Sequence, residues 1–237
     1  MRRIMLLMAS VLVLGLAAGA QANSVTIGWV TERHRETVTL HAGDYSVTGY
    51  NGQYMVGYGS QANMLPMLCI EVEEYSGGSW TANIVDLTKA PMGDGHMALT
   101  GGPPMNDAQA TLLRKLWAMG GPTYCDYSKD WDPGQDKARA MQLAAWEIVY
   151  EYMNDTTTLN VTTGNFYVTG SSANSTANTM LNSLADYTGP LPELVALSNQ
   201  NPGKQDFVRI IPEPVTMAGL MLGIGGLGGY IRRRRRA

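Results

Sequence analysis

Along the first third of the chain, polar and apolar positions alternate in short segments. Turns that contain glycine separate these segments. The segments are rich in Val, Thr, Tyr and Ile, and Gly-Asp, Asn-Gly and Gly-Ser pairs lie between them. This pattern is typical of antiparallel strands, because successive side chains of a strand point to opposite faces of the sheet. It predicts strands at residues 24–31, 36–40, 45–47, 54–58 and 65–72.

A helical period replaces this alternation in the second half of the chain. We expect a first helix that Asn106 or Asp107 caps and that Gly120-Gly121 ends, and further helices at residues 138–153 and 175–187. Between and after them, the sequence predicts a hairpin that turns at 163–165, within residues 159–169, and a last strand at 205–211. The pattern as a whole indicates an α+β fold, a mainly antiparallel sheet or sandwich with a helical subdomain.

The helix expected at residues 138–153 carries a polar residue in the middle of its apolar face. On a helical wheel Gln142 shares that face with Trp146 and Val149, while Glu147 points the other way. An amide buried without partners costs roughly 1–3 kcal/mol. Gln142 therefore needs a partner in the fold and is a candidate functional residue.

The N-terminus has the features of a secretory signal peptide. A basic start is followed by a short apolar core and by Ala20-Gln21-Ala22, a small-x-small cleavage pattern. We expect residues 1–22 to be removed after Ala22 and residues 23–211 to form one exported, extracytoplasmic domain.

The C-terminus predicts one transmembrane helix. Residues 215–231 form a 17-residue stretch without a charge, about 25 Å long as a helix. Five arginines follow directly and are expected to stay in the cytoplasm, with the folded domain outside: Arg232, Arg233, Arg234, Arg235 and Arg236.

The whole segment 212–237 resembles a PEP-CTERM sorting signal, in the order and spacing of Pro212-Glu213-Pro214, the apolar stretch and the arginines. The resemblance implies a Gram-negative bacterium that exports the protein and holds it in the cytoplasmic membrane by the C-terminal helix. A membrane protease, exosortase, is then expected to process it near the motif, which leaves it on the cell surface or in the extracellular matrix. A plain membrane anchor is the open alternative. In both cases the domain faces the outside.

The net charge of −3 for the full chain conceals an acidic domain, because seven arginines lie at the two ends. Residues 23–211 contain ten Lys or Arg and nineteen Asp or Glu, which gives the domain a charge of about −9. The basic residues are not clustered, so the sequence argues against binding to nucleic acid or to an anionic lipid surface.

No residue cluster typical of an enzyme, a cofactor site or a metal site stands out. There is no G-x-S-x-G motif, and the three histidines are scattered along the chain. Four acids between residues 126 and 136 lack the spacing of a calcium loop and are expected to form a solvated acidic loop. We therefore expect no catalytic residues, no metal, no cofactor and no enzymatic activity.

Two short stretches, "LCIE" at 68–71 and "MQLAAW" at 141–146, resemble the two signatures of bacterial surface thioester domains. The resemblance implies a β-rich body with a helical subdomain, in which the Cys69 sulfur is joined to the side-chain carbonyl of Gln142. Trp146 would then keep water away from the bond, and a nucleophilic amine on a surface or matrix ligand would attack it. The chain has Met141 and Ala145 where those signatures usually have Thr or Ser and Ile.

The second cysteine, Cys125, leaves another interpretation open. An exported chain with two cysteines also fits a Cys69–Cys125 disulfide. Two functions therefore remain, a surface or matrix protein that adheres covalently through a Cys69–Gln142 thioester, and a non-reactive structural protein of the extracellular polysaccharide or biofilm layer with a disulfide or free thiols.

Overall fold

The computed structural model describes residues 24–60, 62–72, 77–91, 103–124, 134–151, 158–199 and 204–211. In these residues the strands are β1 (Ser24–Ala42), β2 (Tyr45–Tyr58), β3 (Met64–Cys69), β4 (Trp80–Asp86), β5 (Phe166–Thr169), β6 (Leu194–Ser198) and β7 (Phe207–Ile210). The helices are α2 (Asp107–Tyr124), α3 (Gly134–Tyr150) and α4 (Asn174–Ser183), with one short 3-10 turn, η1 (Leu87–Lys89). The predicted α+β class, with a mainly antiparallel sheet, is confirmed.

The strands form one sheet whose pairings close into a ring. Their order is β2-β3-β7-β6-β4-β1-β5, β1 also pairs with β2, and the pairings are antiparallel throughout the described residues. β1 reaches three neighbours because it is 19 residues long and has register shifts at Ile27/Val30 and at Arg33/Glu36. The predicted strands 24–31 and 36–40 are therefore one strand, since β-bulges bend a strand without ending it.

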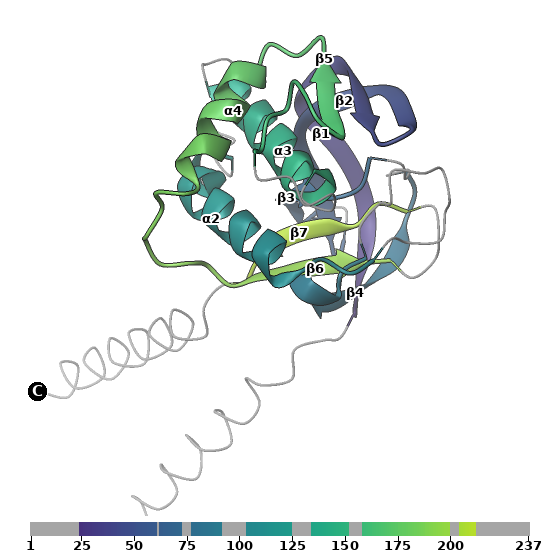
Figure 1. The fold of residues 1–237 in the computed structure, drawn as a ribbon. Helices are drawn as coiled ribbons and strands as arrows, with labels where there is room; N and C mark the ends of the chain where they lie inside the picture. Colours follow the sequence, from purple (N-terminus) through teal and green to yellow (C-terminus); the bar gives the residue numbers. More distant parts are fainter. Residues whose placement is uncertain are drawn as a thin grey trace, which may run out of the picture.

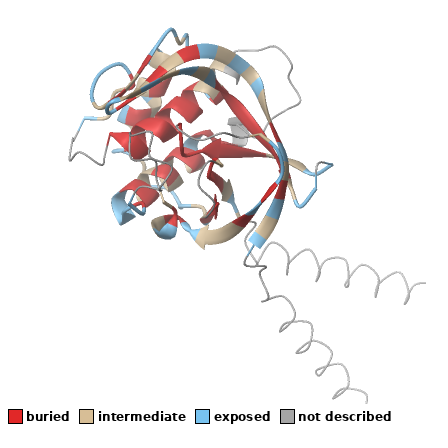
Figure 2. Ribbon diagram, turned by 90° about the vertical axis from the view of Figure 1, so that its right-hand side faces the viewer, coloured by how far each residue is buried: buried red, intermediate tan, exposed pale blue. Residues whose placement is uncertain are grey.

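α3 is the centre of the core. It contacts β1, β2, β3 and β5 on one side and α2 and α4 on the other, so that the strands curve around it (Figures 1 and 2). Every residue from Ala140 to Tyr150 is buried. The helical wheel predicted two faces of opposite character, but both are covered, because α2 and α4 pack against the face that carries Glu147.

α2 begins where the sequence predicted and ends later. Asn106 and Gln109 form a reciprocal cap, in which each side chain accepts a hydrogen bond from the main-chain N–H of the other, at 2.9 and 3.0 Å. The helix continues through Gly120-Gly121 to Tyr124. A Cβ atom on Gly120 would lie 2.9 Å from Sδ of Met141 on α3, so this glycine permits close helix packing and does not end the helix.

Two strands of the sheet, β4 and β6, were not predicted from the sequence, and one predicted hairpin is wrong. Of residues 159–169 only β5 is a strand, and its partner is the end of β1 (Leu40 opposite Val168). Residues 161–165 form turns and bends instead, with Gly164 at a φ of 113°. Strand pairing with β1 therefore replaces the local hairpin.

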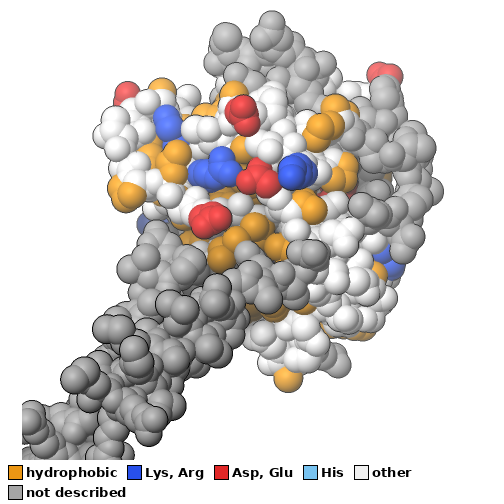
Figure 3. All heavy atoms as spheres, turned by 90° about the horizontal axis from the view of Figure 1, so that it is seen from below, with side chains coloured by type: hydrophobic (Ala, Val, Ile, Leu, Met, Phe, Trp, Pro, Cys, Tyr) orange, Lys and Arg blue, Asp and Glu red, His pale blue; other side chains and the backbone are white. Residues whose placement is uncertain are grey.

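Within the described part of the chain no helix is both long and apolar enough to cross a membrane. The predicted signal peptide (residues 1–22, with Ala20 and Ala22) and the predicted transmembrane helix (215–231) lie outside the described residues. On the face of the domain shown in Figure 3, acidic and basic side chains alternate and form no basic patch. One ion pair of the described residues joins Arg114 and Asp86, at 3.9 Å.

Candidate functional site

Cys69 is the last residue of β3 and is completely buried. It lies opposite Phe207 of β7, and the next residue, Ile70, donates its main-chain N–H to Asp206 O at 3.1 Å. Because successive residues of a strand direct their N–H and C=O groups to opposite sides, the main-chain groups of Cys69 face away from β7. On that side the pairing of β3 with β2 ends at Met67. The N–H and C=O of Cys69 therefore need a partner that is not a strand.

Gln142 of α3 is that partner. Its Oε1 accepts the main-chain N–H of Cys69 at 3.1 Å, and its Nε2 donates to the main-chain O of Cys69 at 2.7 Å. The side chain is completely buried, and the two bonds hold its carboxamide against the residue that carries the thiol. The structure thus brings Cys69 and Gln142 together across the contact between sheet and helix, and it explains a polar residue on an apolar helix face.

The thiol of Cys69 is unpaired and buried. Its Sγ donates to the main-chain O of Glu71 at 2.9 Å. Burial raises the pKa of the thiol well above its usual value, and the nearby carboxylates of Glu71 and Asp206 raise it further. The sulfur is therefore a neutral thiol at physiological pH, and any attack by it must transfer its proton to another group.

Trp146 lies one helical turn beyond Gln142 and is 1% exposed. Its ring packs edge-on against Tyr54, with the ring centroids 6.3 Å apart, and tilted against Phe166, at 6.5 Å. A hydrogen bond between the Trp146 side chain and the Cys69 thiol lowers the thiol pKa, but by less than burial raises it. Trp146 therefore separates the sulfur from solvent and directs a dipole at it.

Residues next to β7 hold the end of β3 in place. The carboxylate of Glu71 accepts the main-chain N–H of Asp206 at 2.8 Å, and Gln205 Nε2 donates to Glu71 O at 3.2 Å. The hydroxyl oxygen of Tyr150 on α3 accepts a hydrogen bond from the main-chain N–H of Val72, in the same segment, at 2.9 Å. Sequence reasoning did not identify Tyr150, Gln205 or Asp206, because their partners are main-chain groups that carry no sequence signal.

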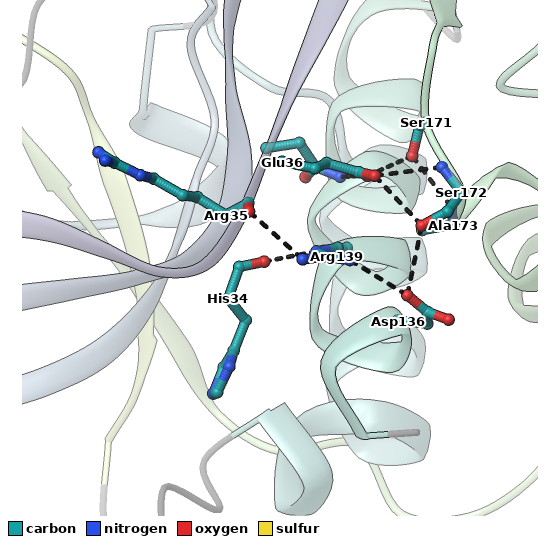
Figure 4. Close-up of polar contacts among 9 residues, drawn as sticks. His34, Arg35, Glu36, Asp136, Arg139, Ser171, Ser172 and Ala173 are labelled. Atoms are coloured by element: carbon teal, nitrogen blue, oxygen red, sulfur yellow. Dashed lines mark hydrogen bonds and ion pairs between the residues drawn. The ribbon is translucent and has the colours of Figure 1, made fainter. Parts of the chain in front are cut away.

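A second polar cluster fixes the start of α3 (Figure 4). Arg139 donates to the main-chain oxygens of His34 and Arg35, at the β1 bulge where His34 has a φ of 53°, and pairs with Asp136 at 3.3 Å. Close by, Glu36 accepts hydrogen bonds from Ser171 and Ser172. Arg139 precedes Gln142 by three residues, so this cluster sets the position of the helix that presents Gln142 to Cys69.

Met141 packs against Gly120 of α2. In the signature of bacterial surface thioester domains this position usually carries a hydroxyl; in this chain it is used for helix packing. Ala145 is buried in α3 next to Trp146.

Several predicted residues lie outside the described part of the chain. They are Cys125, the sorting motif Pro212, Glu213 and Pro214, and the arginines 232–236. Cys69 itself has a free thiol, so the Cys69–Cys125 disulfide is not formed in this structure.

Comparison with protein-family models and with curated proteins finds no match. Among solved structures, the chain is similar to the N-terminal thioester domain of the fibronectin-binding protein SfbI from Streptococcus pyogenes. The similarity has 11% sequence identity and a TM-score of 0.39, and it covers 74% of this chain and 94% of that chain. At these values it assigns neither a family nor a function.

Proposed function

We propose that this protein is an exported surface or matrix protein that attaches covalently to a partner through a Cys69–Gln142 thioester. In the forming step, the Cys69 sulfur bonds to the side-chain carbonyl carbon of Gln142. The carbon–nitrogen bond of the amide breaks, the thiol proton moves to the departing nitrogen, and one ammonia leaves. The observation that carries this proposal is the pair of hydrogen bonds between the Gln142 carboxamide and the main chain of Cys69.

The same hydrogen bonds favour the chemistry of that step. When sulfur attacks, negative charge develops on Oε1 of Gln142, and the Cys69 N–H already bound to this oxygen at 3.1 Å stabilises that charge. The site is dry, since Cys69, Gln142 and Trp146 are each at most 1% exposed. A site without water protects a thioester from hydrolysis.

The thioester then serves as an electrophile for one reaction. The nitrogen of a partner amine bonds to the Gln142 carbonyl carbon, the carbon–sulfur bond breaks, and the proton of the amine passes to the Cys69 sulfur. The products are an amide that joins the partner to Gln142 and a free thiol at Cys69. Because the thioester is consumed and not regenerated, the protein acts as an adhesive and not as an enzyme.

Export and sorting complete the proposal. The order of basic start, apolar core and Ala20-Gln21-Ala22 supports removal of a signal peptide. The order of Pro212-Glu213-Pro214, an uncharged stretch and five arginines supports retention in the cytoplasmic membrane and processing by exosortase. Both patterns support a location outside the cytoplasm, where a partner with exposed amines would be accessible.

Intact-mass measurement of the exported protein tests the thioester. We expect a mass lower than the sequence mass by one ammonia, and we expect this loss to disappear in Cys69→Ala and in Gln142→Ala. Gln109→Ala is a matched control, because Gln109 is also a fully buried helix glutamine bonded to main-chain oxygens, of Ile148 and Val149, but not to a cysteine. A full sequence mass in the folded wild-type protein would refute the proposal.

One observation favours the non-reactive alternative. The hydrogen bonds to Cys69 satisfy the Gln142 amide without a covalent bond, so Gln142 can also act only as a bracket between α3 and β3. A structural protein of the extracellular layer built in this way would keep its full mass and take up no methylamine.

A further inference from the structure

Strand β2 has a free edge near the turn that joins it to β1. β1 pairs with β2 from Tyr45 to Tyr58, whereas β3 pairs with β2 only from Tyr54 to Gly57. Within the part of the chain that the structure describes, residues 45–50 therefore have a strand on one side and none on the other. The ring of strands is closed at the far end of β2 and open at this end.

The main-chain groups of every second residue point to this free edge. The two-residue turn at 43–44 makes the residues on either side of it a hydrogen-bonded pair, and such pairs alternate with non-bonded pairs along antiparallel strands. Ser46, Thr48 and Tyr50 therefore direct their N–H and C=O groups away from β1. The main-chain oxygen of Tyr50 agrees with this direction, because it accepts a hydrogen bond from the Tyr54 hydroxyl at 3.1 Å.

A cavity lies beside this edge, on the inner face of the sheet. The inward-facing residues of the stretch are Tyr45, Val47 and Gly49, and all three line the cavity, whose volume is about 470 Å³. Gly49 leaves room in it, since a Cβ atom at this position would meet nothing within 4 Å. Of the described residues that line the cavity, Glu32 is the one with a charge. The cavity can therefore take an apolar side chain that arrives along the edge.

The edge carries none of the features that usually prevent a strand from pairing with another chain. Such features include proline, charged residues and bulges. The stretch Tyr45–Tyr50 reads YSVTGY, which contains no proline and no charge, and its register with β1 has no shift. Ser46, Thr48 and Tyr50 are exposed. The edge is therefore available to the main chain of another strand.

An extended peptide fits both the edge and the cavity. A strand beside β2 supplies partners for the free N–H and C=O groups, and every second side chain of that strand points to the inner face. A second copy of β2 would satisfy the edge but not the cavity. Its own inward side chains, Tyr45 and Val47, are already packed against the core of that copy.

The two ends of the edge differ in charge. At one end the Arg35 guanidinium lies 4.5 Å from the ring centroid of Tyr50, and at the other end Asp44 precedes Tyr45. Both charged residues are exposed. Charge complementarity therefore favours a peptide with an acid beside Arg35 and a base beside Asp44, which sets the direction in which the peptide lies.

We propose that β2 binds an extended segment of a partner protein, which adds a strand along Tyr45–Tyr50 and places an apolar side chain in the cavity next to Gly49. In this mode of recognition the main-chain hydrogen bonds supply affinity, and the pocket for alternate side chains supplies specificity. The volume of about 470 Å³ lies within the range of roughly 300–1,000 Å³ for ligand pockets. The binding does not require the thioester, because neither Cys69 nor Gln142 lines the cavity.

Amide hydrogen exchange of the free exported protein tests the edge itself. The N–H groups of Val47 and Gly49 are bonded to β1 and should exchange slowly, whereas those of Ser46 and Thr48 face the edge and should exchange fast. Slow exchange at all four positions would show that the edge is already covered and would overturn the proposal.

A display library of random twelve-residue peptides supplies the probe for binding. Selection uses the exported Cys69→Ala protein, in which no thioester can form. We expect the selected peptides to alternate apolar and polar residues and to slow the exchange of the Ser46 and Thr48 amides. If no selected peptide protects these two amides, strand addition to β2 is wrong.

Two variants test the edge and the cavity separately. Thr48→Pro removes an N–H that faces the edge and leaves the hydrogen bonds to β1, so it should weaken peptide binding about tenfold at little cost in stability. Thr48→Val is its matched control, because it loses the same hydroxyl and keeps the N–H, and it should bind as the wild type does. Gly49→Val fills the cavity without meeting another residue and should also weaken binding about tenfold. Equal affinities for Thr48→Pro, Gly49→Val and Thr48→Val would refute the proposal.

Sedimentation of the free protein distinguishes a peptide from a second copy. We expect a monomer, and a dimer that Thr48→Pro dissociates would show that the edge pairs with another β2 instead. The ammonia loss at Cys69 and Gln142 should be the same in Thr48→Pro as in the wild type, so failure of strand addition and failure of the thioester are seen in different measurements.

Discussion

Glu147→Gln should flatten the dependence of stability on pH between about pH 5 and pH 9. Glu147 lies on α3 and is completely buried; its Oε1 accepts the main-chain N–H of Asn160, and its Oε2 has no partner among the described residues. Burial raises its pKa from 4.5 to about 8, and the charge of Glu151 one turn further on adds to the rise. The folded protein therefore keeps a proton that the unfolded chain releases.

The sign and size of the effect follow from this difference. Between pH 4.5 and about 8 the folded state binds more protons than the unfolded state, so the free energy of unfolding falls as the pH rises. The window spans about 3.5 pH units, each worth about 1.4 kcal/mol, which gives a loss of about 5 kcal/mol. Since domains are stable by only about 5–15 kcal/mol, this loss brings the wild-type protein close to unfolding at pH 9.

Denaturant unfolding followed by circular dichroism at pH 5, 6, 7, 8 and 9 measures this loss. The series covers about 3 pH units of the window, from pH 5 to about 8, so the wild-type free energy of unfolding should fall by about 4 kcal/mol more than that of Glu147→Gln. Glu193→Gln, which removes a negative charge from an exposed position, should follow the wild-type curve. If the wild-type and Glu147→Gln curves run parallel, the burial of Glu147 as an acid with a raised pKa is wrong.

Three further predictions concern packing around the site. Trp146→Ala should cost about 3–5 kcal/mol of stability, measured by denaturant unfolding, whereas Trp146→Phe should cost clearly less because a ring still fills the space. Equal costs for the two variants would contradict the packing described. Arg139→Met removes hydrogen bonds to the β1 bulge, and it should cost about 2–3 kcal/mol of stability and slow the loss of ammonia. A variant with wild-type stability and a wild-type rate of ammonia loss would show that these hydrogen bonds are not needed. Gly120→Ala should cost about 1–3 kcal/mol of stability through contact with Met141, and Met141→Ala should relieve that cost. Strictly additive effects in the double variant would argue against the contact.

Much of the fold was predictable wherever a single segment carried a complete pattern. The cap at Asn106 and the period of α3 are local signals, and both are found in the structure. β4 and β6 were missed because each is defined by its pairing with a strand distant in the sequence. The end of α2 was misplaced because Gly120 serves the packing of two helices, which is a tertiary property.

The residues of the candidate site were predictable from the sequence, but the contact that joins them was not. The wheel identified Gln142 as a polar residue that needed a partner, and the resemblance to thioester domains named Cys69. The structure places the two residues together, but the bonds are made by the main chain of Cys69, which no side-chain pattern encodes. The sequence around Gln205, just before β7, gives no sign of a functional position, because only the pairing of strands in the ring brings this residue near the thiol.

The position of β7 between β3 and β6 determines how such a domain would bear a pulling force. With a partner bonded to Gln142 and the chain held by its C-terminal segment, tension passes along the backbone from residue 142 to residue 211. β1 to β4 and α2 carry no load on this path. β7 and β6 lie on it, yet each has an unloaded neighbour, since β7 pairs with β3 and β6 pairs with β4. The mechanical strength of the attachment would then depend on these two strand pairings, because their hydrogen bonds join the part of the chain under tension to the part that carries no load.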